Sequence, residues 1–75
     1  MSLWKVRVQC LAADDINERY PYCYMTALVD EETSMAAMFA GKKCVEDNAP
    51  SDTKWLEFTA MEASRVQLPV LTDLI

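Results

Sequence analysis

The stretch "LWKVRVQCL", residues 3–11, alternates between apolar and polar side chains over its whole length. The apolar face holds Trp4, Val6, Val8 and Cys10, and the polar face holds Lys5, Arg7 and Gln9. A period of two residues is typical of a β-strand that is buried on one face only. The sequence therefore predicts a strand over 3–11 with a basic outer face.

The chain around this strand is short and rich in apolar residues. It has 75 residues, of which 52% are hydrophobic, and it has a single glycine, Gly41. That composition is too apolar for a disordered chain, so we expect one compact folded domain over 1–75. Because so small a domain buries only a modest core, a homo-oligomer is a reasonable expectation.

The stretch "YCYMTALV", residues 22–29, is apolar on both of its alternating faces. Tyr22, Tyr24, Thr26 and Leu28 share one face, and Cys23, Met25, Ala27 and Val29 share the other. This pattern predicts a central strand that is covered on two sides.

A helix is expected over 34–46. Thr33 and Ser34 are good N-cap residues, and Met35, Met38, Phe39 and Val45 fall on one helical stripe. Gly41 weakens this prediction, because glycine costs about 1 kcal/mol in a helix interior, and it can instead be the C′ residue of a shorter helix. The alternative is that 35–45 forms a strand in a hairpin with 22–29.

The last third of the chain shows two further alternations. In "KWLEFTAM", residues 54–61, Leu56, Phe58 and Ala60 share one face, and Trp55, Glu57, Thr59 and Met61 share the other. Residues 62–64 are expected to turn the chain into "RVQLPVL", residues 65–71, where Pro69 favours a sheet edge.

These elements together predict a small two-layer α+β domain, with an antiparallel sheet of about four strands and one helix on a face. The alternative is a mostly β domain of five short strands.

The residues that usually carry out catalysis are scarce in this chain. There is no histidine, which excludes the usual serine and cysteine nucleophile systems, and one glycine cannot build a phosphate-binding loop. Cys10, Cys23 and Cys44 are too widely spaced for a disulfide framework or for an ordinary zinc site. We expect no enzyme activity, no cofactor and no metal.

The net charge of −5 disfavours direct contact with nucleic acid and with anionic membranes. It is compatible with a protein partner that has a basic surface, although solubility alone also explains it. No segment is long and apolar enough to span a membrane, and the N-terminus lacks a leader pattern, so we expect a cytoplasmic protein, in its own cell or in a host cell.

Two sets of residues are candidates for binding. The aromatic set consists of Trp55, Tyr20, Tyr22 and Tyr24, residue types that are common in interfaces. Trp55 is expected either on an outer face with Met61, Lys5 and Arg7 or packed under the loop over 46–53.

The acidic set lies at the ends of the expected elements, where it can form one rim or simply solvated loop edges. It consists of Asp30, Glu31, Glu32, Glu46 and Asp47, with Asp14, Asp15, Glu18 and Asp52.

A small acidic protein-binding module without catalytic activity is the function that this profile favours. By analogy of profile alone, it suits an inhibitor encoded by a phage or mobile element and directed against a host defence or nucleic-acid-binding protein. The alternatives are a structural subunit of a homo-oligomeric assembly and a small enzyme or metal protein that uses cysteine and carboxylates.

Overall fold

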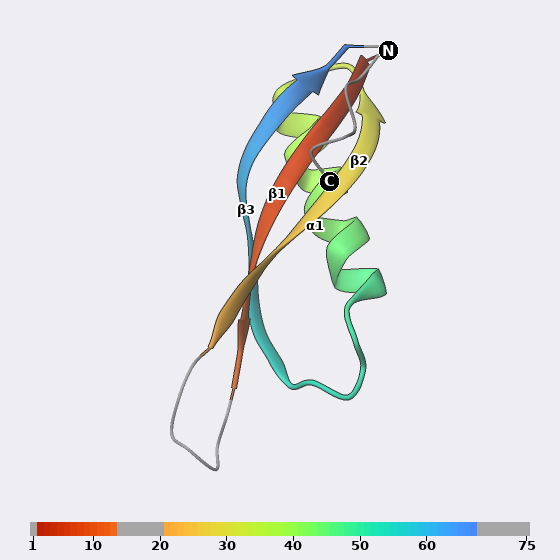
Figure 1. Cartoon of the computed structure of the whole chain (residues 1–75). Helices are drawn as coiled ribbons and strands as arrows, with labels where there is room; N and C mark the ends of the chain where they lie inside the picture. Colours follow the sequence, from red (N-terminus) through yellow and green to blue (C-terminus); the bar gives the residue numbers. More distant parts are fainter. Residues whose placement is uncertain (1, 14–20, 68–75) are drawn as a thin grey trace.

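The computed structural model describes residues 2–13 and 21–67. In these residues the order of elements is β1 (Ser2–Ala12), β2 (Tyr22–Glu31), α1 (Ser34–Asn48) and β3 (Trp55–Val66). The three strands form one antiparallel sheet in the order β2-β1-β3, and α1 lies across one face of it (Figure 1). The predicted two-layer α+β class is confirmed, with three described strands in place of about four.

The first strand is the centre of the sheet. β1 pairs with β2 along one side and with β3 along the other, and Val6, Val8 and Cys10 are completely buried beneath α1. The alternation read in residues 3–11 is therefore confirmed.

The prediction that 22–29 is a central strand is wrong, because β2 is an edge strand of the three described strands, and among the described elements α1 covers one of its faces only. An apolar pattern on two faces does not distinguish a strand buried on both sides from a strand that exposes apolar side chains to a partner or to water.

The helix is present, and the strand alternative for 35–45 is wrong. Thr33 is the N-cap residue, and its hydroxyl accepts a hydrogen bond from the Ala36 backbone N–H at 3.2 Å. Gly41 lies inside the helix rather than at its end.

The face that α1 turns to the sheet differs from the predicted stripe. The buried helix residues are Ala37, Gly41 and Val45, whereas Met35 and Phe39 are 69% and 71% exposed. Small residues at a spacing of four bring the helix axis close to β1, because a larger side chain at these positions would hold the two layers apart. Of the predicted stripe, only Val45 belongs to the buried core.

The third strand is continuous where the sequence predicted a turn over 62–64. The pairing of β1 with β3 shifts at two places, so that Met61 and Leu56 each have no opposite residue on β1. Such bulges insert one extra residue and bend the strand without ending it. The bulge at Leu56 moves Trp55 to the same face as Phe58 and leaves Leu56 exposed, so the prediction that Leu56 and Phe58 share one face and Trp55 the other is wrong. Residues 68–71 of the expected last strand lie outside the described residues.

Candidate functional site

The sheet face that is turned away from α1 carries no second layer among the described residues; we refer to it as the open face. The residues of β1 that alternate with the buried ones project from it, together with their partners in the register. They are Leu3, Lys5, Arg7, Gln9 and Leu11 of β1; Tyr22, Tyr24, Thr26, Leu28 and Asp30 of β2; and Glu57, Thr59, Glu62, Ser64 and Val66 of β3. Leu3, Gln9, Leu11 and Val66 are half-buried, and the others are exposed.

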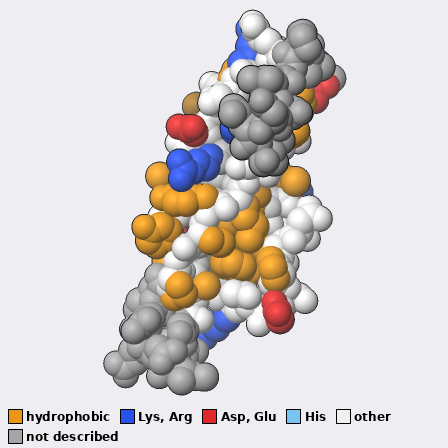
Figure 2. All heavy atoms as spheres, viewed as in Figure 1, with side chains coloured by type: hydrophobic (Ala, Val, Ile, Leu, Met, Phe, Trp, Pro, Cys, Tyr) orange, Lys and Arg blue, Asp and Glu red, His pale blue; other side chains and the backbone are white. Residues whose placement is uncertain are grey.

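The most exposed apolar side chains that the register places on the open face belong to β2. Tyr22 is 61% exposed, Tyr24 is 42% exposed and Leu28 is 63% exposed. Figure 2 is viewed from the side on which α1 lies behind the strands, and it shows apolar side chains gathered over the middle of the molecule. Large apolar side chains that stay in contact with water are common where a surface binds another protein.

The aromatic side chains on this face are held by contacts with one another. The rings of Tyr22 and Tyr24 meet edge to face with their centroids 5.7 Å apart, and the Arg7 guanidinium carbon lies 3.9 Å from the centre of the Tyr24 ring. Each type of contact contributes about 0.5–1 kcal/mol. The three side chains are therefore partly ordered before any partner binds, which lowers the entropy lost on binding.

The open face carries charges of both signs. Arg7 and Lys5 lie on the central strand, and Glu62 and Glu57 lie on β3, where Glu62 is the register partner of Arg7. The basic outer face that was predicted for residues 3–11 is confirmed, and acidic residues of the neighbouring strand border it.

Trp55 packs under the loop that precedes β3, as in the second of the two sequence-based expectations. Its indole N–H donates to the carbonyl oxygen of Pro50 at 3.0 Å, and its ring lies 5.7 Å from that of Phe58 on the helix-covered face of the sheet. Trp55 is thus separated from Lys5 and Arg7, which lie on the open face. Tyr20 lies outside the described residues.

The acidic candidates do not form one rim. Asp30, Glu31 and Glu32 lie where β2 ends and the chain enters α1, whereas Glu46 and Asp47 lie in the last turns of the same helix (Figure 1). A helix of 15 residues separates the two groups by about 20 Å. Asp14, Asp15 and Glu18 lie outside the described residues.

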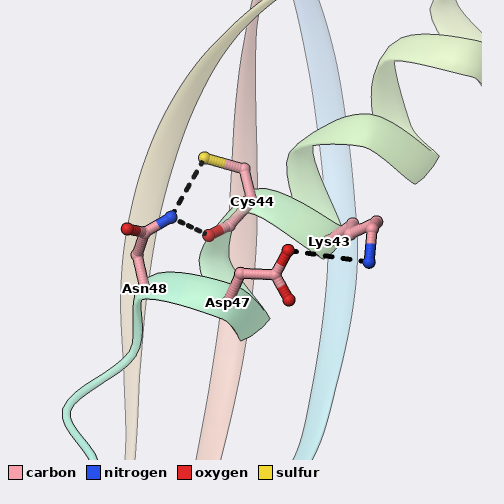
Figure 3. A network of polar contacts seen from close by, with 4 residues as sticks. All are labelled: Lys43, Cys44, Asp47 and Asn48. Carbon is pink, nitrogen blue, oxygen red and sulfur yellow. Dashed lines mark hydrogen bonds and ion pairs between the residues drawn. The ribbon is translucent and has the colours of Figure 1, made fainter.

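Glu46 and Asp47 are also partly neutralised within the helix. Glu46 lies 3.7 Å from the Lys42 ammonium and Asp47 lies 3.6 Å from that of Lys43, each one helical turn away. Figure 3 shows the second pair beside Asn48, whose side-chain amide donates to the Cys44 carbonyl oxygen at 2.8 Å. These contacts are typical of a solvated helix end, where exposed ion pairs contribute at most about 1 kcal/mol.

A second apolar surface was not foreseen from the sequence. Met35, Met38, Phe39 and Lys42 of α1, with Ala60 of β3, line a shallow hollow of about 270 Å³. The sequence contained the signal, because Met35, Met38 and Phe39 belong to the predicted helical stripe, but that stripe was expected to face the sheet. Small residues elsewhere on the helix supply the core contact instead.

The described residues contain no group of three or more cysteine and acidic side chains that could hold a metal ion. All three cysteines are free, with Cys10 buried and with Cys23 and Cys44 exposed. Burial raises the pKa of the Cys10 thiol to about 11, and the nearby Cys23 side chain adds to this shift through its charge and a hydrogen bond.

Comparison with known proteins gives no relative from which a function can be transferred. No protein-family model, no curated protein and no solved structure matches the chain. Among the described residues, no helix combines the length and the apolar character needed to cross a membrane.

Proposed function

We propose that this chain is a protein-binding module without catalytic activity, and that the open face of its sheet is the binding surface. The observation that carries the proposal is that, in the part of the chain that the structure describes, α1 covers one face of the sheet and leaves Tyr22, Tyr24 and Leu28 exposed on the other. Burying three such side chains against a partner would release about 1.5–3 kcal/mol for each side chain that becomes fully buried.

The partner that fits this surface is a folded protein with an apolar patch and basic residues at its border. The apolar patch would cover the β2 side of the open face, and the basic border would lie against Glu57 and Glu62 of β3. The net charge of −5 favours the same partner by attracting a basic surface over a longer range. A small acidic inhibitor of a host defence or nucleic-acid-binding protein would have this combination of features.

The test is a capture experiment with variants on both apolar surfaces. The wild-type chain, Tyr24→Ala/Leu28→Ala and Met35→Ala/Phe39→Ala are each immobilised and exposed to one purified basic target or to the lysate in which it is found. We expect the target to bind the wild type and Met35→Ala/Phe39→Ala with similar affinity. Its affinity for Tyr24→Ala/Leu28→Ala should be at least tenfold lower.

Loss of the target from Met35→Ala/Phe39→Ala alone would show that the hollow beside α1, rather than the open face, is the binding surface. Circular dichroism on the same variants separates loss of binding from loss of folding.

Self-assembly is the second candidate function, because the same open face carries side chains of both charge signs and is therefore able to meet a second copy of itself. Light scattering at several protein concentrations tests it. A dimer that Tyr24→Ala/Leu28→Ala dissociates would replace the first proposal, and a monomer at all concentrations would exclude the second.

A further inference from the structure

We propose that Cys10 and Cys23 are a redox-sensitive pair, which an oxidised low-molecular-weight disulfide such as oxidised glutathione converts into an intramolecular disulfide between β1 and β2. This inference does not depend on the proposed binding function, since it concerns the opposite face of the sheet.

The first argument is the register of the sheet. Cys10 of β1 and Cys23 of β2 are directly opposite one another, so their side chains project from the same face of neighbouring strands. Further along the same register, the Ala12 N–H donates to the Pro21 carbonyl oxygen at 2.8 Å. Because hydrogen-bonded pairs recur at every second residue, the Cys10–Cys23 pair is also of the hydrogen-bonded type.

The Cα separation of such a pair suits a disulfide. Opposite residues of a hydrogen-bonded pair have Cα atoms about 5.5 Å apart, within the range of about 4.4–6.8 Å that disulfides span. Their Cβ atoms are about 5.5 Å apart and have to approach to about 4.5 Å or less, so the bond closes with a movement of about 1 Å at the start of β2 and without a change of register. The Cys10 thiol donates to the Val8 carbonyl oxygen at 3.7 Å, and Cys23 is near enough to add to the burial that raises the pKa of Cys10.

The second argument is the unequal exposure of the two sulfur atoms. Cys23 is exposed and can be reached by a reagent in solution, whereas Cys10 is completely buried. An exposed first cysteine beside a protected second one is the arrangement of a reactive thiol with its resolving partner. Burial and the raised pKa keep Cys10 protonated, so Cys23 is the first to react.

The reaction takes place in two balanced steps. The Cys23 thiolate attacks one sulfur of oxidised glutathione, and one molecule of glutathione leaves as a thiolate that takes up a proton. The Cys10 thiol then loses its proton and attacks the Cys23 sulfur of the mixed disulfide, which releases the second glutathione. The two cysteines lose two electrons and two protons, and the oxidised glutathione gains both.

Cys44 provides an internal control. It is also an exposed free cysteine, but it lies on the helix, where its sulfur is 3.9 Å from the Asn48 side-chain nitrogen. With no cysteine opposite it in the sheet register, we expect Cys44 to stop at the mixed disulfide with glutathione.

The native wild-type chain is incubated with oxidised glutathione, alkylated, cleaved with trypsin and mapped by mass spectrometry without reduction. Cleavage at Arg7, Arg19 and Lys43 places the three cysteines in separate peptides. We expect a linked pair of peptides holding Cys10 and Cys23, and a Cys44 peptide that carries glutathione. A lasting glutathione adduct on Cys23, or a link to Cys44 or to a second chain, would overturn the proposal.

The same treatment of Cys44→Ser and of Cys10→Ala/Cys44→Ser checks the order of the steps. In the first variant, the intact mass of the single chain should fall by the mass of two hydrogen atoms. Its Tm should rise by about 10 °C, because the bond closes a loop of fewer than 15 residues. The second should keep one glutathione on Cys23 with no rise in Tm. A disulfide that forms in Cys44→Ser only after denaturation would contradict the inference.

Discussion

Gly41 of α1 lies directly against Val6 of β1, so close that a Cβ atom at position 41 would be 2.5 Å from the Cβ of Val6 and 2.6 Å from its Cγ1. Val6 is completely buried at the centre of the sheet. The helix can approach the sheet to this distance only because position 41 has no side chain. The single glycine of the chain therefore sets the spacing between the two layers.

We predict that Gly41→Ala lowers the free energy of unfolding by about 1–2 kcal/mol. In an exposed helix the same change stabilises by about 1 kcal/mol, but here it forces a methyl group into a filled core, which typically costs about 1–3 kcal/mol. Val6 is β-branched and has little rotamer freedom with which to move aside. Urea unfolding followed by circular dichroism measures the change.

The control for this prediction is the double-mutant cycle with Val6→Ala, which removes Cγ1 and Cγ2 of Val6 but keeps its Cβ. The two substitutions should be non-additive by at least about 1 kcal/mol, since one relieves part of the clash that the other creates. A Gly41→Ala variant as stable as the wild type would show that the layers are not in contact at this point.

The strand over 3–11 and the limits of the helix could be predicted from the sequence, whereas the buried face of the helix, where Gly41 meets Val6, could not. The strand over 3–11 was predicted correctly because one of its faces is buried and the other exposed. Such a strand has apolar and polar residues in strict alternation. The helix was predicted within two residues of its observed end, because Thr33 marks its start and alanines favour its interior. Its buried face was wrong, because hydrophobicity ranks Met35 and Phe39 above Ala37 and Gly41, whereas close packing requires the smaller residues.

The third strand was misread for a different reason. A bulge changes the alternation by one residue, so the sequence of a bulged strand resembles two strands with a turn between them. Nothing in the sequence around Leu56 or Met61 marks either bulge, because both depend on how β3 pairs with β1. For the candidate site, the sequence provided Tyr22 and Tyr24 as binding residues, but their place on an uncovered face depends on the layer order.

We predict that Phe39→Gln changes the free energy of unfolding by no more than about 0.5 kcal/mol, because the side chain is exposed beside the hollow and not in the core. Ala37→Leu is the matched change on the buried face of the same helix. It should destabilise by about 2 kcal/mol or more, because Ala37 is completely buried. Chemical denaturation of both variants tests the assignment of faces, and a large loss in Phe39→Gln would reverse it.

We predict that Trp55→Phe lowers the free energy of unfolding by about 1 kcal/mol and Trp55→Ala by about 3 kcal/mol. Phenylalanine keeps the ring contact with Phe58 but loses the hydrogen bond to the Pro50 carbonyl, whereas alanine loses both. Thermal unfolding with a binding assay separates this packing role from an interface role. If Trp55→Phe keeps its stability and loses its partner, Trp55 is a binding residue instead.

We predict that stability falls between about pH 8.5 and pH 11 and that Cys10 is responsible for part of the fall. Because the pKa of the folded Cys10 thiol is raised to about 11, the unfolded chain loses this proton first as the pH rises. The contribution is therefore fully present below the unfolded pKa and is lost as the pH rises through the folded one; it amounts to at most about 3 kcal/mol. Urea unfolding under reducing conditions should show a shallower fall in Cys10→Ala than in the wild type. Cys44→Ala, which removes an exposed thiol, should keep the wild-type profile, and equal slopes in all three chains would show that Cys10 is not protected from ionisation by the fold.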